Sequence, residues 1–203
     1  MNLFERAKNI LVTPKTEWEV IKGEQATVAD LFTKYAMILA AIPAIATFIG
    51  QSIVGVSLGP FGSFKIPMGN GILYAVLQYV FTLVGVYLAA FVVDALAPSF
   101  GSTKDMVASL KVVVYSWTAA WIAGIFGIIP TIAILGILGL YSIYLLYLGL
   151  KVVKDTPQDK LVGYVVVVII VLIIIYFVIG YLVTAIAMPN YYNELMKGMN
   201  LGN

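Results

Sequence analysis

The sequence predicts an all-α polytopic membrane protein with five transmembrane helices and a short amphipathic N-terminal region. Hydrophobic residues make up 62% of the 203 residues and charged residues 11%, and the mean hydropathy of +1.00 lies outside the soluble globular range. Residues 112–150 carry no charge at all. One bilayer crossing takes about 20 residues, so this stretch fits two. Gly127 and Pro130 mark the turn between them.

Two residue types that carry much of enzyme chemistry, Cys and His, are absent. Disulfides, thiolate metal sites and cysteine nucleophiles are therefore excluded, and the commonest general base and zinc ligand is missing. No carboxylate pair or Ser/Lys dyad stands at helical spacing inside the apolar stretches. We therefore expect no enzyme, no catalytic residue, no metal site and no cofactor. The formal net charge of +2 gives no general attraction to nucleic acid, so no nucleic-acid partner is expected.

Residues 1–30 predict a cytoplasmic amphipathic segment at the membrane interface. In its first helix, an apolar face is expected to hold Leu3, Phe4, Ala7, Ile10 and Leu11, and the polar face Glu5, Arg6, Lys8 and Asn9. Pro14 ends this pattern, and a second short helix should use Trp18 and Ile21 as apolar contacts. The segment either caps the helix bundle or docks a partner. Its five acidic residues and lack of a long apolar run predict no cleaved signal peptide.

The transmembrane domain is predicted over residues 31–187, in five spans. The spans are expected at about 31–54, 72–96, from Ser102 or Thr103 as helix cap to about Phe126, 131–150 and 161–187. In the first span Ala36, Ala40 and Ala44 form a stripe of small residues that allows close helix approach. Gly136 and Gly139 should do the same in the fourth.

The remaining segments are connections. Residues 55–71, dense in Gly and Pro, predict a loop that is either re-entrant or interfacial. The fifth span has almost no polar atom and is expected to face lipid at the edge of the bundle. Residues 188–203 predict a short external interfacial tail.

Basic residues predict the orientation in the membrane. Ten of the twelve Lys and Arg residues fall on the side of the N-terminus and of the second and fourth connections, whereas Lys65 and Lys197 fall on the other. Because cytoplasmic segments carry the excess of basic residues, the N-terminus should be cytoplasmic and the C-terminus outside. The expected location is the cell's inner or plasma membrane, as a multi-pass protein.

Several segments resemble the prokaryotic branch of the Yip (Ypt/Rab-interacting protein) domain family. They are FGSTKDMVASLKVVVYSWTAAWIAGIFGIIP, ILGLYSIYLLYLGL, KDTPQDKLVGY and the N-terminal ILVTPKTEWEVIK. The resemblance implies five spans with a cytosolic N-terminus. Animal and fungal members bind prenylated Rab-type GTPases and act in vesicle traffic and membrane shaping. Their Asp-Leu-Tyr-Gly-Pro signature has here only the counterpart Asp30-Leu31-Phe32, without the Gly-Pro pair. The family carries over no catalytic residue.

Charged groups near the bilayer are the best candidates for a functional site. Asp94 ends the second span and Lys111 lies about two turns into the third, so they should reach a similar depth and approach within salt-bridge reach, directly or through one water. With Tyr115 they form the candidate ligand- or ion-binding site. The favoured function is a non-enzymatic scaffold or adaptor in membrane organisation or trafficking-like processes. The alternative is a small transporter, channel or lipid-moving protein with a polar site between spans two and three. Expected partners are membrane lipids, a protein at the cytoplasmic face and a second copy in a homo-oligomer.

Overall fold

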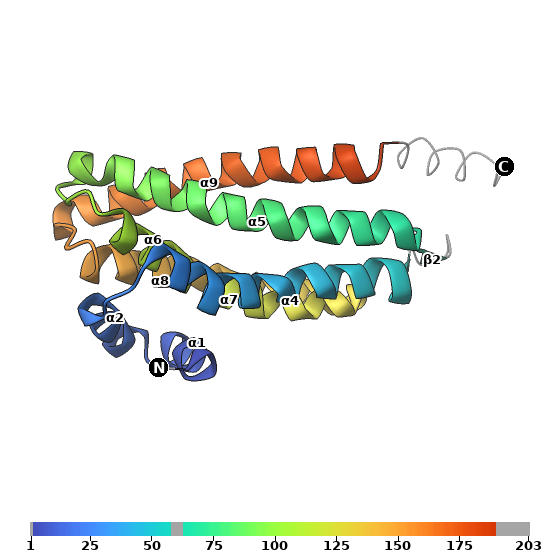
Figure 1. The fold of residues 1–203 in the computed structure, drawn as a ribbon, viewed down its shortest axis with the longest axis horizontal. Helices are drawn as coiled ribbons and strands as arrows, with labels where there is room; N and C mark the ends of the chain where they lie inside the picture. Colours follow the sequence, from blue (N-terminus) through green and yellow to red (C-terminus); the bar gives the residue numbers. More distant parts are fainter. Residues whose placement is uncertain (1, 58–62, 190–203) are drawn as a thin grey trace.

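Five helices of the chain are long and apolar enough to cross a membrane, and they lie side by side as a bundle (Figure 1). The computed structural model describes residues 2–57 and 63–189. Within these residues the spans are Val28–Val54, Met68–Phe100, Met106–Ile128, Pro130–Val152 and Gln158–Ala187. The predicted fold class is thereby confirmed. Of the predicted tail, residues 190–203 lie outside the described part of the chain.

The secondary-structure elements follow the chain in this order. The N-terminal cap comprises α1 (Leu3–Val12) and α2 (Pro14–Gly23). Span one comprises α3 (Val28–Leu31), the π-helix η1 (Phe32–Ala36), α4 (Met37–Phe48) and the π-helix η2 (Ile49–Val54). The strands β1 (Val56–Ser57) and β2 (Ser63–Phe64) precede span two, which comprises α5 (Met68–Leu96) and the 3₁₀-helix η4 (Ala97–Phe100). Span three comprises α6 (Met106–Ser116), α7 (Thr118–Ala123) and the 3₁₀-helix η5 (Gly124–Ile128). Span four comprises the 3₁₀-helix η6 (Pro130–Leu140) and α8 (Tyr141–Val152), and span five is α9 (Gln158–Ala187).

Two predicted helix starts differ from the structure. Span two begins at Met68, so residues 68–71 are helical and not part of the loop. The described part of that loop holds a short antiparallel hairpin of β1 with β2. In span three the cap is Asp105, whose side chain accepts a hydrogen bond from the backbone N–H of Ala108 at 3.0 Å. Ser102, which was expected to cap this helix, bonds instead with Thr156 across the bundle end.

The turn between spans three and four lies where the sequence predicted it. η5 ends at Ile128, Ile129 is extended, and η6 begins at Pro130, whose missing N–H suits the first turn of a helix. The backbones approach very closely here, since a β-carbon on Gly50 of span one would lie only 2.0 Å from the Gly127 carbonyl oxygen. Span one is therefore packed directly against the turn that joins spans three and four.

The small residues of the spans are confirmed in part as packing positions. Ala36, Ala40 and Ala44 are buried, as their stripe predicted. Gly139 also faces a neighbour, because a β-carbon there would lie 3.1 Å from the Ala120 α-carbon. The prediction for Gly136 is wrong: nothing lies within 4 Å of its would-be β-carbon. Residues three apart lie on the same side of a 3₁₀-helix, so the two glycines differ in their position along η6: Gly139 lies level with Ala120 of α7, and Gly136, one turn earlier, has no neighbour.

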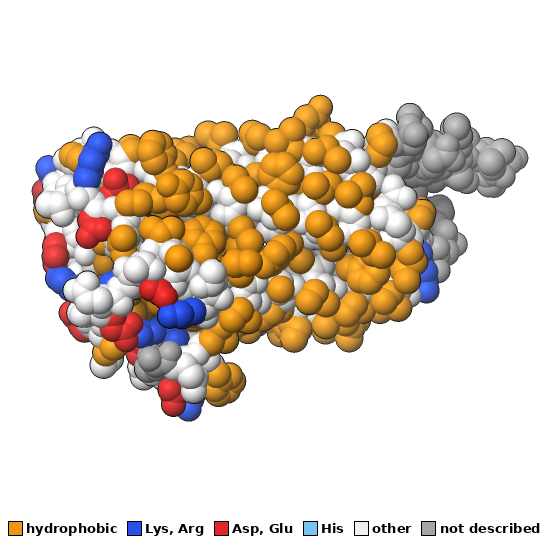
Figure 2. All heavy atoms as spheres, in the orientation of Figure 1, with side chains coloured by type: hydrophobic (Ala, Val, Ile, Leu, Met, Phe, Trp, Pro, Cys, Tyr) orange, Lys and Arg blue, Asp and Glu red, His pale blue; other side chains and the backbone are white. Residues whose placement is uncertain are grey.

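The outer surface of the bundle is apolar along most of its length, and charged side chains gather at one end (Figure 2). Span five contributes strongly to the apolar belt, with Ile173, Ile174 and Phe177 all more than half exposed. It also packs along α5, whose Asn70 side chain donates a hydrogen bond to the Ala187 carbonyl of α9 at 2.8 Å. The fifth span thus has the exposed apolar side that a lipid-facing helix needs.

The cap packs on the charged end of the bundle, against α7 and α8. Trp18 and Ile21 of α2 are fully buried, as predicted. In α1 the prediction was wrong at two positions. Phe4 is 74% exposed, whereas Arg6 is 4% exposed. Arg6 points inward because it pairs there with the buried Glu17 of α2 and with Glu24, the residue after that helix. The helix rotation that places Arg6 inside turns Phe4 outward.

Candidate functional site

Asp94, the carboxylate that ends span two, lies among three polar groups of other segments. Its Oδ1 accepts hydrogen bonds from the Asp105 backbone N–H at 2.7 Å and the Ser109 hydroxyl at 3.2 Å, and lies 3.6 Å from Lys154 Nζ. The predicted direct pair with Lys111 is wrong. Ser109 and Lys111 are two residues apart on α6, and such side chains point to nearly opposite sides of a helix. Since Ser109 faces Asp94, Lys111 faces away.

Lys154 is the buried cation of this group, with only 1% of its side chain exposed. It donates hydrogen bonds to the backbone carbonyls of Thr103 at 2.7 Å and Asp105 at 3.3 Å. Burial lowers the pKa of Lys154, and the carboxylates of Asp94 and Asp105 oppose that shift. We name Asp94, Asp105, Ser109 and Lys154 the Asp94 cluster. It ties the ends of spans two, three and four together.

Lys111 serves the N-terminal cap instead. Its ammonium group donates hydrogen bonds to the backbone carbonyls of Ile21, at 3.0 Å, and Glu24. These carbonyls belong to the last turn of α2 and the residue after it, where helical carbonyls lack partners and a cation is favourable. Lys111 is only 7% exposed, so it fixes the end of α2 against the third span.

Tyr115 lies one turn further along α6, under Arg6 of the cap. The Arg6 guanidinium carbon lies 5.4 Å from the centre of the Tyr115 ring, within cation–π range. Arg6 also forms ion pairs with Glu17, at 2.5 Å, and with Glu24. The ring of Tyr115 packs edge-on against Tyr35, with centroids 4.8 Å apart. We name Arg6, Glu17, Glu24, Lys111 and Tyr115 the cap joint.

The predicted site is thus divided between two clusters. Lys111 and Tyr115 belong to the cap joint and Asp94 to its own cluster. Sequence reasoning missed Arg6, Glu17 and Lys154. A signal for the first two exists, because Arg6 falls on the face of Leu3 and Ile10, and Glu17 on that of Trp18 and Ile21. Lys154 has no such signal, since it lies in a turn.

These clusters hold the protein together. Arg6 and Glu17 each have 5% of the side chain exposed, and buried charges of this kind persist when they are paired and hydrogen-bonded. Among the residues described by the structure, no three His, Cys, Asp or Glu side chains are grouped as metal ligands. The chemistry that the geometry supports is the firm attachment of α1 and α2 to the bundle.

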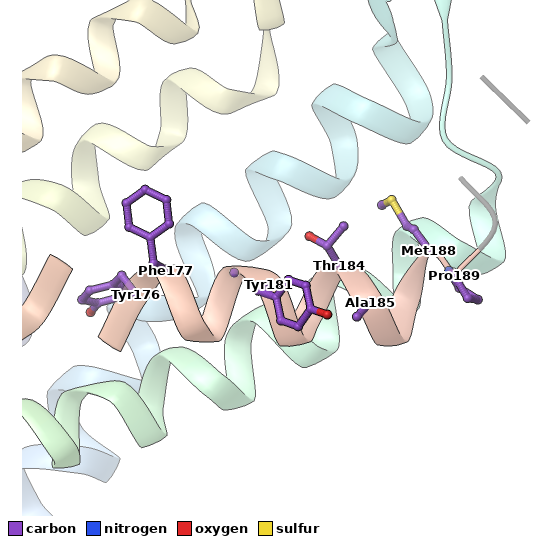
Figure 3. Close-up of a pocket in the computed structure, with 8 residues that line it drawn as sticks. Tyr176, Phe177, Tyr181, Thr184, Ala185, Met188 and Pro189 are labelled. Atoms are coloured by element: carbon purple, nitrogen blue, oxygen red, sulfur yellow. The ribbon is translucent and has the colours of Figure 1, made fainter. Parts of the chain in front are cut away.

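A hollow of about 760 Å³ lies elsewhere, along the last turns of α9 (Figure 3). Its described lining comes from one helix and the two residues that follow it, among them Phe177, Tyr181 and Thr184. α9 ends at the opposite end of the bundle from α2 (Figure 1). The hollow therefore has no part in the cap joint or the Asp94 cluster.

Comparisons with known proteins match the chain over most of its length. A family model described as the Yip1 domain matches residues 8–181. The inner membrane protein YohC of Escherichia coli is 28% identical over 112 residues, in strain K12 and in strain O6:H1 alike. These matches cover 55% of this chain and 57% of the relative, so the chain aligns with little more than half the length of its curated relatives. No solved structure matches.

Proposed function

This chain belongs to the Yip1 domain family, and we propose that it is a non-enzymatic scaffold or adaptor of the inner membrane that organises protein partners and lipids. The inner membrane is proposed from the name of the bacterial relative, together with five apolar helices of spanning length. Family membership alone does not imply the scaffold role, so the support for this role comes from the structure.

The cap joint is the observation that carries the scaffold role. Arg6, Lys111 and Tyr115 are buried, and their contacts attach the cap to the bundle. A scaffold needs a surface of fixed shape, and the joint supplies one by holding α2 against α8. The outer side of α2 exposes Lys15, Glu19 and Lys22, which offer charges of both signs to a protein partner.

The cap is proposed to face the cytoplasm. Figure 2 shows charged side chains gathered at the end of the bundle that carries the cap. Of the twelve basic residues, ten belong to the segments that the span order places at this end. The positive-inside bias supports a cytoplasmic N-terminus, and an odd number of spans then puts the C-terminus outside.

A second candidate function is the movement of a lipid or small solute. The observation that favours it is apolar space between membrane-spanning helices. A cavity of about 230 Å³ lies between spans three, four and five, beside Trp117, Ser142 and Tyr176, and another of about 320 Å³ lies between α4 and α5. If this candidate is right, filling the space between α4 and α5 with Ala75→Phe should reduce movement across vesicle membranes more than it disturbs folding.

The scaffold proposal is tested by purifying the tagged protein from native membranes in lipid nanodiscs and identifying bound proteins by mass spectrometry. We expect one or more proteins at near-stoichiometric amounts. A double charge reversal on the outer side of α2, Lys15→Glu with Glu19→Lys, should release them, because both side chains are exposed. The matched control is Lys65→Glu, an exposed cation near the other end of the bundle.

Two outcomes would count against the scaffold. One is the absence of any protein enriched over an unrelated multi-span control. The other is equal retention of partners by the α2 variant and the wild type, which would remove the cap surface from the proposal. Movement of lipid or solute that is lost in Ala75→Phe would favour the second candidate.

A further inference from the structure

The first helix of the cap has a second apolar side that touches no other part of the described protein core. Ala7 and Ile10 pack inward. Phe4 and Val12 are 74% and 69% exposed, and their spacing of eight residues places them on the same side of α1. Apolar side chains of this size are stabilised when they are covered from water. With two such exposed side chains on one helix of ten residues, we expect this side of α1 to be covered by another molecule.

The depth of α1 along the bundle identifies the partner. The Tyr141 hydroxyl donates a hydrogen bond to the Leu11 carbonyl at 3.2 Å, which fixes the end of α1 beside the first turn of α8. From there to Lys151 at the charged end is ten residues, or about 15 Å at 1.5 Å per residue. α1 therefore lies well back from the tip of the bundle, beside its membrane-spanning part.

The length of span four places this level about 5 Å inside the edge of the hydrocarbon, at the depth of an interfacial helix. η6 has 11 residues and α8 has 12. At 2.0 and 1.5 Å per residue they total about 40 Å, which exceeds the hydrocarbon thickness of about 30 Å by about 10 Å. η6 carries no charge, so the excess falls at the charged end of α8. Tyr141 and Tyr144, with ring centroids 5.4 Å apart, lie where aromatic side chains mark the interface.

We propose that α1 is an in-plane membrane anchor whose Phe4 and Val12 side inserts into the boundary between lipid headgroups and acyl chains. Figure 2 shows hydrophobic side chains at the edge of the cap, next to the apolar belt of the bundle, so the inserted side continues a surface that lipid already covers. Lys8 lies between the two on the exposed face and can extend its ammonium group to lipid phosphates. The anchor does not depend on the scaffold role.

The absence of cysteine allows a direct depth measurement. Phe4→Cys, Val12→Cys and the control Glu19→Cys, on the exposed side of α2, each receive one nitroxide label. The proteins are reconstituted in vesicles of phosphatidylethanolamine and phosphatidylglycerol, and spin relaxation is measured with oxygen and with a water-soluble nickel chelate. Oxygen concentrates in lipid and the chelate stays in water. We expect an oxygen-to-nickel collision ratio severalfold higher at residues 4 and 12 than at residue 19.

A second measurement does not use the nitroxide label, which is itself apolar. Benzoylphenylalanine in place of Phe4 should form phospholipid adducts under light, detected by intact mass, whereas the same group in place of Glu19 should not. Equal collision ratios at the three positions, with no lipid adduct at residue 4, would overturn the proposal. Crosslinks between two copies of the chain through residue 4, with low access to both relaxation reagents, would overturn it too, because a second copy would then cover this side.

Discussion

Arg6 connects three elements of the structure through the cap joint. Its guanidinium pairs with Glu17 and Glu24 and lies over the Tyr115 ring, so one side chain connects α1, α2 and α6. A buried charge of this kind costs desolvation energy that only good partners offset. The joint is therefore strong while complete and weak once one partner is removed.

Replacing Arg6 tests this joint at the scale of one residue. Arg6→Met keeps the length of the side chain but leaves Glu17, with 5% exposure, without its cation. We expect a loss of about 3 kcal/mol in the free energy of unfolding, measured by denaturant titration in mixed micelles. The control Lys8→Met changes an exposed residue of the same helix and should stay within about 0.5 kcal/mol. Equal stability of the two variants would show that the joint contributes nothing.

Helical periodicity predicts which residues are buried as long as the buried residues are apolar and the exposed ones polar. It correctly placed Trp18 and Ile21 in the core, but failed at Arg6 and Phe4. Arg6 is buried because of Glu17 and Glu24, whose positions depend on the turn between α1 and α2. The pairing of Asp94 failed for the same reason, since several lysines share its depth and only tertiary structure selects Lys154.

The elements themselves follow from local composition. Each span is a run of apolar residues of bilayer length, and the turn at Pro130 follows from the geometry of proline. Helix starts are less predictable, because a cap depends on which side chain reaches the free N–H groups. Asp105 reaches Ala108, although Ser102 and Thr103 are equally good cap residues by type.

The two glycines of η6 provide a matched pair at this scale. Gly139→Leu would press against the Ala120 backbone, which lies 3.1 Å from the new β-carbon and cannot move aside easily. We expect it to cost about 1–3 kcal/mol and to lower the melting temperature in detergent. Gly136→Leu points into open space and should leave the melting temperature unchanged. A reversed order of the two would mean that η6 is shifted along its axis relative to α7, since both glycines lie on the same side of this helix.

At the scale of the whole molecule, charged side chains are concentrated at one end of the bundle axis. The capped end holds most charged side chains and the opposite end few, as Figure 2 shows. This asymmetry supports one orientation in the membrane, and the apolar belt between the ends supports a multi-pass arrangement. Cap, bundle and orientation together would place one rigid surface at the cytoplasmic face.

Impermeant thiol labelling of intact cells tests the orientation. The chain has no cysteine, so Lys65→Cys and Asp159→Cys each introduce one exposed thiol, near opposite ends of the bundle. We expect the reagent to label residue 65 from outside and to reach residue 159 only after the membrane is opened. Labelling of residue 159 in intact cells, with residue 65 protected, would reverse the proposed topology.

Hydrogen–deuterium exchange in nanodiscs is the most direct test of the central claim, that the cap joint makes the cap part of the folded bundle. In the wild type, the amides of α2 should exchange at least about 100-fold more slowly than in an unstructured peptide. In Arg6→Met, exchange should rise in α1 and α2 while α5 and α9 stay unchanged. Exchange of α2 at the unstructured rate in the wild type, or equal protection of the cap in both proteins, would contradict the claim.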